Sequence, residues 1–253
     1  MHAHPAAPRS QGPCSPRSSW LVALGLVLAL AGCGSDDADE PDAPQSGGGS
    51  TGAVGGGPEV SPDGQVQYAC SLAKHVEEER GDPADWKGVA GPDADPGAVE
   101  AAAVSSLLGG TAGYELPEHP ELSAAASDLT AAVMRVDLEQ LSSSLEKIVA
   151  GCADISGEQA DVSEAGRVDF ACRLADQVVE EHGSAETWDG LGKEPAWHQA
   201  ASVGALVGGM NGYVVPGSED LSEAGKRIFS AIARLETAEL DDALDAFIAG
   251  CAD

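Results

Sequence analysis

Apolar residues recur at helical spacing near the end of the chain, and the same spacing occurs about 100 residues earlier. The earlier series is Leu138, Leu141, Leu145, Ile148, Val149 and Cys152, and the later one is Leu240, Ala243, Leu244, Phe247, Ile248 and Cys251. Such steps place the apolar side chains on one face of an α-helix, with polar residues such as Glu139 and Glu146 on the other. The pattern therefore predicts two amphipathic helices.

Helices are also predicted upstream of these two. One is expected from about Val66 to Arg80, with Cys70, Ala73 and Val76 on its inner face. Another helix is indicated by apolar residues at helical spacing, namely Leu221, Ala224, Ile228, Ile232 and Leu235. Its candidate N-cap is Ser222, and Ser123 is the candidate at the corresponding place earlier in the chain.

Two alanine-rich stretches complete the set of predicted helices. They cover about 99–110 and 198–208, and they stop at the pairs Gly109-Gly110 and Gly208-Gly209. Glycine suits the left-handed conformation that ends many helices. No stretch shows the sustained alternation of apolar and polar residues that is typical of a strand. The predicted fold class is therefore all-α.

The chain contains an internal duplication. Residues 66–86 align without gaps on 168–188 with 10 of 21 positions identical, and residues 101–154 align on 200–253 with 21 of 54 identical. We call 66–154 the first copy and 168–253 the second copy, and we expect a linker at 155–167. Each copy is predicted to be a small four-helix bundle, so the fold is two tandem repeats.

Four cysteines lie in the two copies, and they are expected to oxidise outside the cytoplasm. Each copy has one near the start of its first helix and one at the end of its fourth. These points meet at one end of an up-down-up-down bundle, which predicts Cys70–Cys152 and Cys172–Cys251 among the three possible pairings. Each disulfide would close a loop of about 80 residues and contribute nominally ~4 kcal/mol.

The N-terminus predicts export. Arg9 and Arg17 are the only charged residues before an apolar run of about 12 residues, from Trp20 to Ala31. This run is too short to span a membrane, which needs about 20 residues, but it fits the apolar core of a signal peptide.

The apolar run ends in Leu30-Ala31-Gly32-Cys33, which resembles the lipobox of bacterial lipoproteins. The resemblance covers only residues 1–33. It implies that 1–32 is a lipoprotein signal peptide, that cleavage occurs before Cys33, and that Cys33 carries acyl chains of the palmitate type. More than one chain gives stable anchoring. The expected location is the outer face of the cytoplasmic membrane.

Composition adds a spacer and a strong charge. Residues 34–65 contain nine glycines, four prolines and no aromatic residue, so 33–65 is predicted to be a disordered acidic tether. All 42 Asp and Glu but only 11 of the 13 Lys and Arg follow Cys33, which leaves a formal net charge of −31. This charge argues against nucleic acid as a partner and favours basic or neutral proteins or small ligands.

The residues offer few candidates for chemistry. No catalytic motif, metal cluster or cofactor site is evident in the sequence, so none is predicted. Glu77-Glu78-Glu79 and Glu180-Glu181, each with a nearby histidine, are better explained as solvated helix ends than as cation sites. Candidates for ligand stacking are the four residues Trp86, Trp188, Trp197 and His198. Of these, Trp197 and His198 occur only in the second copy.

Three functions stay open on this sequence. The first is a non-enzymatic binding or interaction module carried by the lipid anchor. The second is a lipoprotein that binds a cation or a small ligand, and the third is an enzyme of unfamiliar type. A deep pocket that holds a buried histidine beside a carboxylate would favour the third function over the others.

Overall fold

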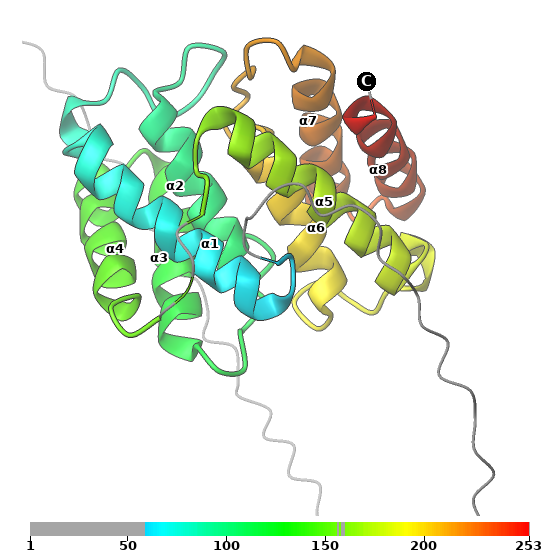
Figure 1. Ribbon diagram of the computed structural model, residues 1–253, viewed down its shortest axis with the longest axis horizontal. Coiled ribbons are helices and arrows are strands. Elements are labelled where there is room, and N and C mark those ends of the chain that lie inside the picture. Colours follow the sequence, from blue (N-terminus) through cyan, green and yellow to red (C-terminus); the bar gives the residue numbers. More distant parts are fainter. Residues whose placement is uncertain (1–58, 156, 158–159, 253) are drawn as a thin grey trace, which may run out of the picture. The chain divides into compact units, whose positions relative to one another are not determined.

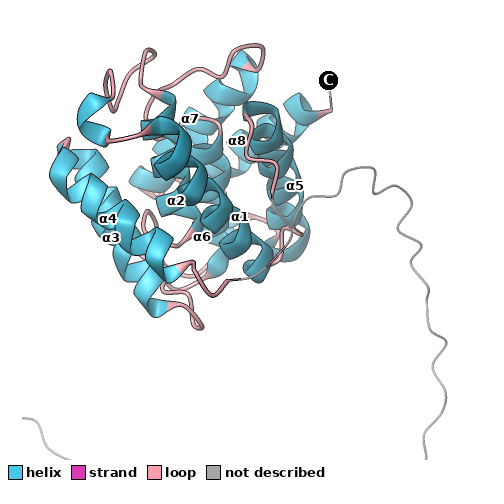
Figure 2. Ribbon diagram, turned by 60° about the vertical axis from the view of Figure 1, so that its left-hand side comes forward, coloured by secondary structure: helices cyan, strands magenta, loops and turns pink. Residues whose placement is uncertain are grey.

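The computed structural model describes residues 59–155, 157 and 160–252. The predicted signal peptide, Cys33 and most of the predicted tether lie outside these residues. Within them the chain is all-helical and contains no strand (Figures 1 and 2). The predicted fold class is confirmed at this level.

Eight α-helices, α1 to α8, make up the described part of the chain. Their bounds are α1 Pro62–His75, α2 Pro96–Leu107, α3 Pro120–Arg135, α4 Leu138–Gly151, α5 Glu164–His182, α6 Pro195–Leu206, α7 Glu219–Arg234 and α8 Thr237–Cys251. A π-helical turn, Val76–Arg80, continues α1, and short 3-10 turns follow at Pro83–Asp85 and Ala185–Thr187. None of the described helices has both the length and the hydropathy of a membrane span.

The helices α1 and α5 both begin about four residues before the sequence predicted. The cause is local capping. The Ser61 hydroxyl accepts a hydrogen bond from the Gly64 N–H at 3.3 Å, and the Ser163 hydroxyl accepts one from the Gly166 N–H at 3.1 Å. A serine cap satisfies one of the free N–H groups of a first helical turn. As a result Arg167, which was expected in the linker, lies in the first turn of α5.

The expected caps of α3 and α7 were wrong. Ser123 and Ser222 lie inside these helices, in the turn that follows the cap. The Ser123 hydroxyl accepts a hydrogen bond from the Leu116 N–H, and the Ser222 hydroxyl accepts one from the Val215 N–H, both at 2.9 Å. Each serine therefore fastens the preceding loop to its helix.

The helices α2 and α6 form the centre of the described unit. Gly97 to Leu107 of α2 and Ala196 to Leu206 of α6 are all buried. Helix α2 packs against α1, α3 and α6, and α6 packs against α5, α7 and α2. Figures 1 and 2 show the two helices between the outer ones, with α1 and α5 crossing the near face of Figure 1.

Small residues let the central helices approach their neighbours closely. A methyl group at Gly204 of α6 would come within 2.9 Å of the Gly225 carbonyl oxygen in α7. Interiors are packed too densely to absorb such a group without a shift of the backbone. The alanine and glycine content of α2 and α6 is therefore a packing requirement.

The predicted disulfide pairing is confirmed. Cys70 of α1 is bonded to Cys152 at the end of α4, with their Cα atoms 5.5 Å apart. Cys172 of α5 is bonded to Cys251 at the end of α8, with a Cα separation of 5.8 Å. Both disulfides tie the first and last helices of one copy, and neither joins the two copies.

Two exposed apolar residues have a left-handed backbone. Val136 follows α3 with φ +57°, and Leu235 follows α7 with φ +56°. This region favours glycine and is strained for a β-branched residue. The side chain of Val136 is 59% exposed, so little packing offsets the strain.

We expect Val136→Gly to stabilise the protein by about 1 kcal/mol, because glycine adopts positive φ without steric cost. In a unit of this size the unfolding midpoint should rise by about 3 °C, measured by circular dichroism. Val136→Thr keeps a β-branched side chain and should leave the midpoint nearly unchanged. An equal rise in both variants would show that the backbone is not the cause.

Candidate functional site

A single carboxylate lies among the central helices. Glu100 of α2 has no exposed surface. Arg80, in the π-helical turn, donates to both of its oxygens, from Nε at 2.9 Å and from Nη2 at 2.8 Å. Arg167 of α5 donates through Nη1 to Glu100 Oε1. A buried carboxylate without such partners would be strongly destabilising, so the two guanidinium groups make its burial possible.

His75 connects this carboxylate with the surface. Its Nε2 lies 3.9 Å from Glu100 Oε2, and its side chain is 26% exposed. The hydrogen bonds of Glu100 to Arg80 raise the pKa of that arginine. We refer to His75, Arg80, Glu100 and Arg167 as the Glu100 cluster. It gathers residues from α1, the π-helical turn, α2 and α5, which belong to both copies.

In the second copy an amide and a histidine stand at the positions of the Glu100–Arg80 ion pair. Gln199 is aligned with Glu100, and His182 is aligned with Arg80. These two side chains also meet, with His182 Nε2 and Gln199 Oε1 2.8 Å apart. The place in the fold is therefore the same, but only the first copy holds a buried charge there.

A surface groove runs along α1 beside His75. It consists of two adjoining hollows of about 400 and 380 Å³ that share Ser71, Lys74 and Gly157. We call it the α1 groove. On α1 and its π-helical turn it is lined by Gln67, Cys70, Ser71, Lys74, His75, Glu78 and Glu79, and on the other sides by Val149, Cys152, Ala153, Ile155, Gly157, Ala160 and Val162.

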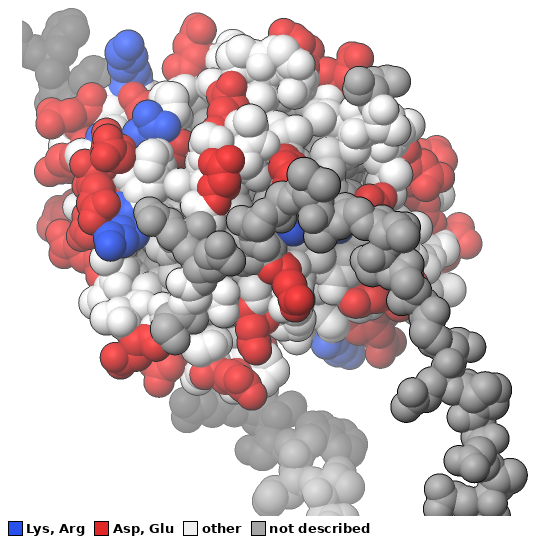
Figure 3. All heavy atoms as spheres, viewed as in Figure 1, with Lys and Arg blue, Asp and Glu red and all other residues white. Residues whose placement is uncertain are grey.

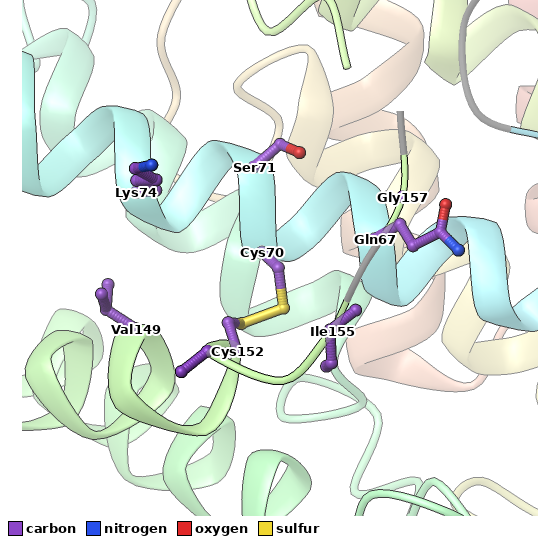
Figure 4. Close-up of a pocket in the computed structure, with 9 residues that line it drawn as sticks. Gln67, Cys70, Ser71, Lys74, Val149, Cys152, Ile155 and Gly157 are labelled. Carbon is purple, nitrogen blue, oxygen red and sulfur yellow. A yellow bond between two sulfur atoms is a disulfide. The ribbon is translucent and has the colours of Figure 1, made fainter. Parts of the chain in front are cut away.

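Figure 4 shows the hollow beside the first disulfide. Gln67, Ser71 and Lys74 follow one another along α1, and the Cys70–Cys152 disulfide bridges α1 to the end of α4. Lys74 Nζ lies 3.8 Å from Glu78 Oε1, where both side chains are largely exposed. The α1 side of the groove thus presents polar and charged side chains, and the opposite side is mainly apolar.

The tryptophans proposed for ligand stacking pack inside the protein. The indole N–H of Trp86 donates to the Arg80 carbonyl oxygen at 3.1 Å, and that of Trp188 donates to the His182 carbonyl oxygen at 3.2 Å. Trp188 is 9% exposed and Trp86 is half-buried. Both indoles close the loop that follows the first helix of their copy, and neither lines the α1 groove.

Trp197 and His198 are both buried, each 3% exposed. Trp197 donates to the Asp189 carbonyl oxygen at 2.5 Å and meets the edge of Trp188. The ring of His198 stacks on Tyr114 of the first copy, with centroids 5.2 Å apart. Burial lowers the pKa of His198 to about 4, and a hydrogen bond to the backbone of Ser106 opposes this only in part.

The acidic helix ends do not gather into a metal site. Among the described residues no group of three or more His, Cys, Asp or Glu has the geometry to hold a metal ion. The two histidines near these acids point elsewhere, because His75 faces Glu100 and His182 faces Gln199. The glutamates of the π-helical turn are solvent-exposed.

Sequence reasoning missed the Glu100 cluster. A signal was present, since Glu100 is the only charged residue between Pro96 and Tyr114, in a stretch that otherwise consists of small and apolar residues. A lone carboxylate in such a helix needs a cationic partner if the helix is buried. Arg167 could not be identified as that partner, because it was placed in the linker.

The described fold is an all-helical unit with two disulfides and a buried ion cluster. Protein-family models, curated proteins and solved structures all fail to match this chain. The functional argument therefore depends on the residues themselves.

We expect the stability to fall as the pH drops from about 6.5 to 4, partly because of His198. Its pKa is about 4 in the folded protein and about 6.5 when unfolded, so the unfolded state binds the proton more readily. The stabilisation is complete above pH 6.5, and about 3 kcal/mol is lost below pH 4. Urea unfolding at pH 7.5 and 4.5 measures most of this loss.

The control variant is His198→Val, because Val99 is the aligned residue of the first copy. Carboxylates titrate in the same pH range in both proteins, so the comparison isolates the histidine. The variant should lose less stability between the two pH values than the unmodified protein. Equal losses would rule out His198 as a source of the pH dependence.

Proposed function

We propose that this protein is an exported lipoprotein with a non-enzymatic binding function. In this proposal Cys33 carries the acyl chains, and the tether between Cys33 and the start of α1 at Pro62 holds the helical unit away from the outer face of the cytoplasmic membrane. The unit consists of two copies of one four-helix repeat. The resemblance at 30–33 and the duplicated sequence support these two statements.

The charge of the protein supports a basic or neutral partner. Figure 3 shows carboxylates spread across the face that carries α1 and α5, with few cations among them. Such a surface repels phosphates and anionic lipid headgroups and attracts cationic groups. The helical unit therefore stands off the membrane and meets partners in the surrounding solution.

The α1 groove is the binding site in this proposal, and one observation carries the assignment. His75 in its wall is held over the buried Glu100, and the aligned residues of the second copy, Gln177 and Gln199, are both neutral amides. A feature that the shared fold requires would be expected in both copies. A polar ligand or a short basic segment of a protein fits the size and lining of the groove.

A small-ligand function is favoured over catalysis by the same geometry. Both Glu100 oxygens already accept hydrogen bonds from arginines, and the 3.9 Å between His75 Nε2 and Glu100 Oε2 is longer than the hydrogen bond that orients a catalytic base. His75 is accordingly assigned to ligand binding.

The lipid anchor predicts a simple change of location. Cys33→Ala should prevent acylation and move the protein from the membrane fraction to the soluble fraction, because the described helices contain no membrane span. Cell fractionation and labelling with a palmitate analogue measure this. Cys14→Ala, which alters the other cysteine of the N-terminal 33 residues, is the control and should leave both results unchanged. Undiminished labelling of Cys33→Ala would contradict the anchor.

Binding in the α1 groove predicts a thermal shift that depends on His75. We would measure the melting temperature with Ca²⁺, Mg²⁺, spermidine, neutral sugars and a tetralysine peptide. A ligand at about 100 times its Kd stabilises by about 2.7 kcal/mol, or on the order of 5–10 °C for this unit. His75→Gln, which copies the residue of the second copy, should abolish the shift.

His119→Gln is the matched control, since it removes a histidine of the same copy that does not line the groove. It should retain the full shift. A shift that survives in His75→Gln would place the ligand elsewhere on the molecule. Unchanged melting temperatures across the whole panel would contradict a groove for cations, amines or sugars.

A further inference from the structure

The two copies meet through aligned residues. Tyr68 of α1 and Phe170 of α5 occupy aligned positions, and their rings stack on each other with centroids 4.0 Å apart. The central helices α2 and α6, which also correspond in the alignment, pack against each other. A surface that meets its own counterpart is the geometry of a twofold-symmetric dimer, here contained in one chain.

The symmetry of this contact is broken by one buried ion pair. Glu100 of the first copy meets Arg167 of α5, but the residue aligned with Glu100 is Gln199, and the residue aligned with Arg167 is Gln65. All four side chains belong to buried residues. The opposite charges are thus distributed one to each side of the contact.

Hydrogen bonds between uncharged groups also make the contact asymmetric. The side-chain amide of Asn211, a buried residue of the second copy, donates to the Val89 carbonyl oxygen at 2.5 Å. The backbone carbonyl of Asn211 accepts from the Gly91 N–H at 2.6 Å. The aligned residue in the first copy is Ala112, which has no such side chain. The copies have therefore diverged most visibly where they touch.

We propose that this contact is a self-specific pairing surface, which joins a first copy to a second copy but joins neither copy to its like. A pair of second copies, each taken with the whole of α5 and therefore with Arg167, would bury Arg167 against Gln199, with no carboxylate. A pair of first copies would lose the bond from Arg167 to Glu100 and the contacts of Asn211. Burying one charge without its partner costs several times more than the intact pair contributes.

The inference rests on the proposed duplication and is independent of what the α1 groove binds. It has a direct physical consequence, because both disulfides lie within a copy. If the chain is cut between the copies, no covalent bond holds them together. The two fragments should nevertheless stay paired through α2, α6 and the Glu100 cluster.

The experiment inserts a protease recognition sequence after Gly157 of the oxidised full chain and cleaves the folded protein. Native mass spectrometry and size-exclusion chromatography then identify the species. We expect only the pair of one first copy with one second copy. Separate fragments after cleavage, or pairs of like copies in comparable amounts, would overturn the proposal.

Charge variants test the cause of the specificity in the same cleaved protein. Arg167→Gln leaves Glu100 with one fewer cation, so the fragments should associate on the order of 100-fold more weakly. The double variant Glu100→Gln with Arg167→Gln resembles the neutral pair of the aligned positions and should recover most of that affinity. It should also raise the share of pairs between like copies.

The control is Arg227→Gln, which breaks an exposed pair with Glu239 and should leave the association unchanged. If Arg167→Gln does not fold, the double variant still tests the proposal through its expected pairs of like copies. Association that is equal in the unmodified protein and in Arg167→Gln would show that the ion pair does not select the partner. A double variant that pairs only as the unmodified protein does would show the same.

Discussion

The burial of Glu100 is the constraint on which the arrangement of this protein depends. A carboxylate inside a helix that is covered on all sides must find cations, and these can only come from neighbouring elements. Arg80 reaches it from the π-helical turn, and Arg167 reaches it from the first turn of α5. The carboxylate therefore ties the π-helical turn after α1 and the first turn of α5 to α2.

The central helices impose a second constraint, which is their freedom from bulky side chains. Because α2 and α6 contact helices on every side, each must present small residues in several directions, as at Gly204 against Gly225. The α1 groove lies apart from this contact, between α1, the end of α4 and residues that precede α5.

The sequence was sufficient to predict the outer helices and the disulfides. Helix α4 has one apolar and one polar face, and the duplication selected a single cysteine pairing, so both were identified without coordinates. Helix α2 gave no such signal, because a helix buried on all sides has no polar face. The start of α5 was missed for a different reason, since the cap by Ser163 depends on local geometry that periodicity does not report.

The differences between the two copies also bear on which residues carry a function. Residues that differ between the copies were expected to mark divergent function, and Trp197 and His198 were chosen on that ground. In the structure both are buried: Trp197 packs against Trp188 of the same copy, whereas His198, like Asn211, contacts the first copy. Packing therefore accounts for these differences. It does not account for His75, which is partly exposed in the α1 groove and faces a charge that the second copy lacks. A difference that packing does not require is the better indication of a binding site, and His75 is such a residue.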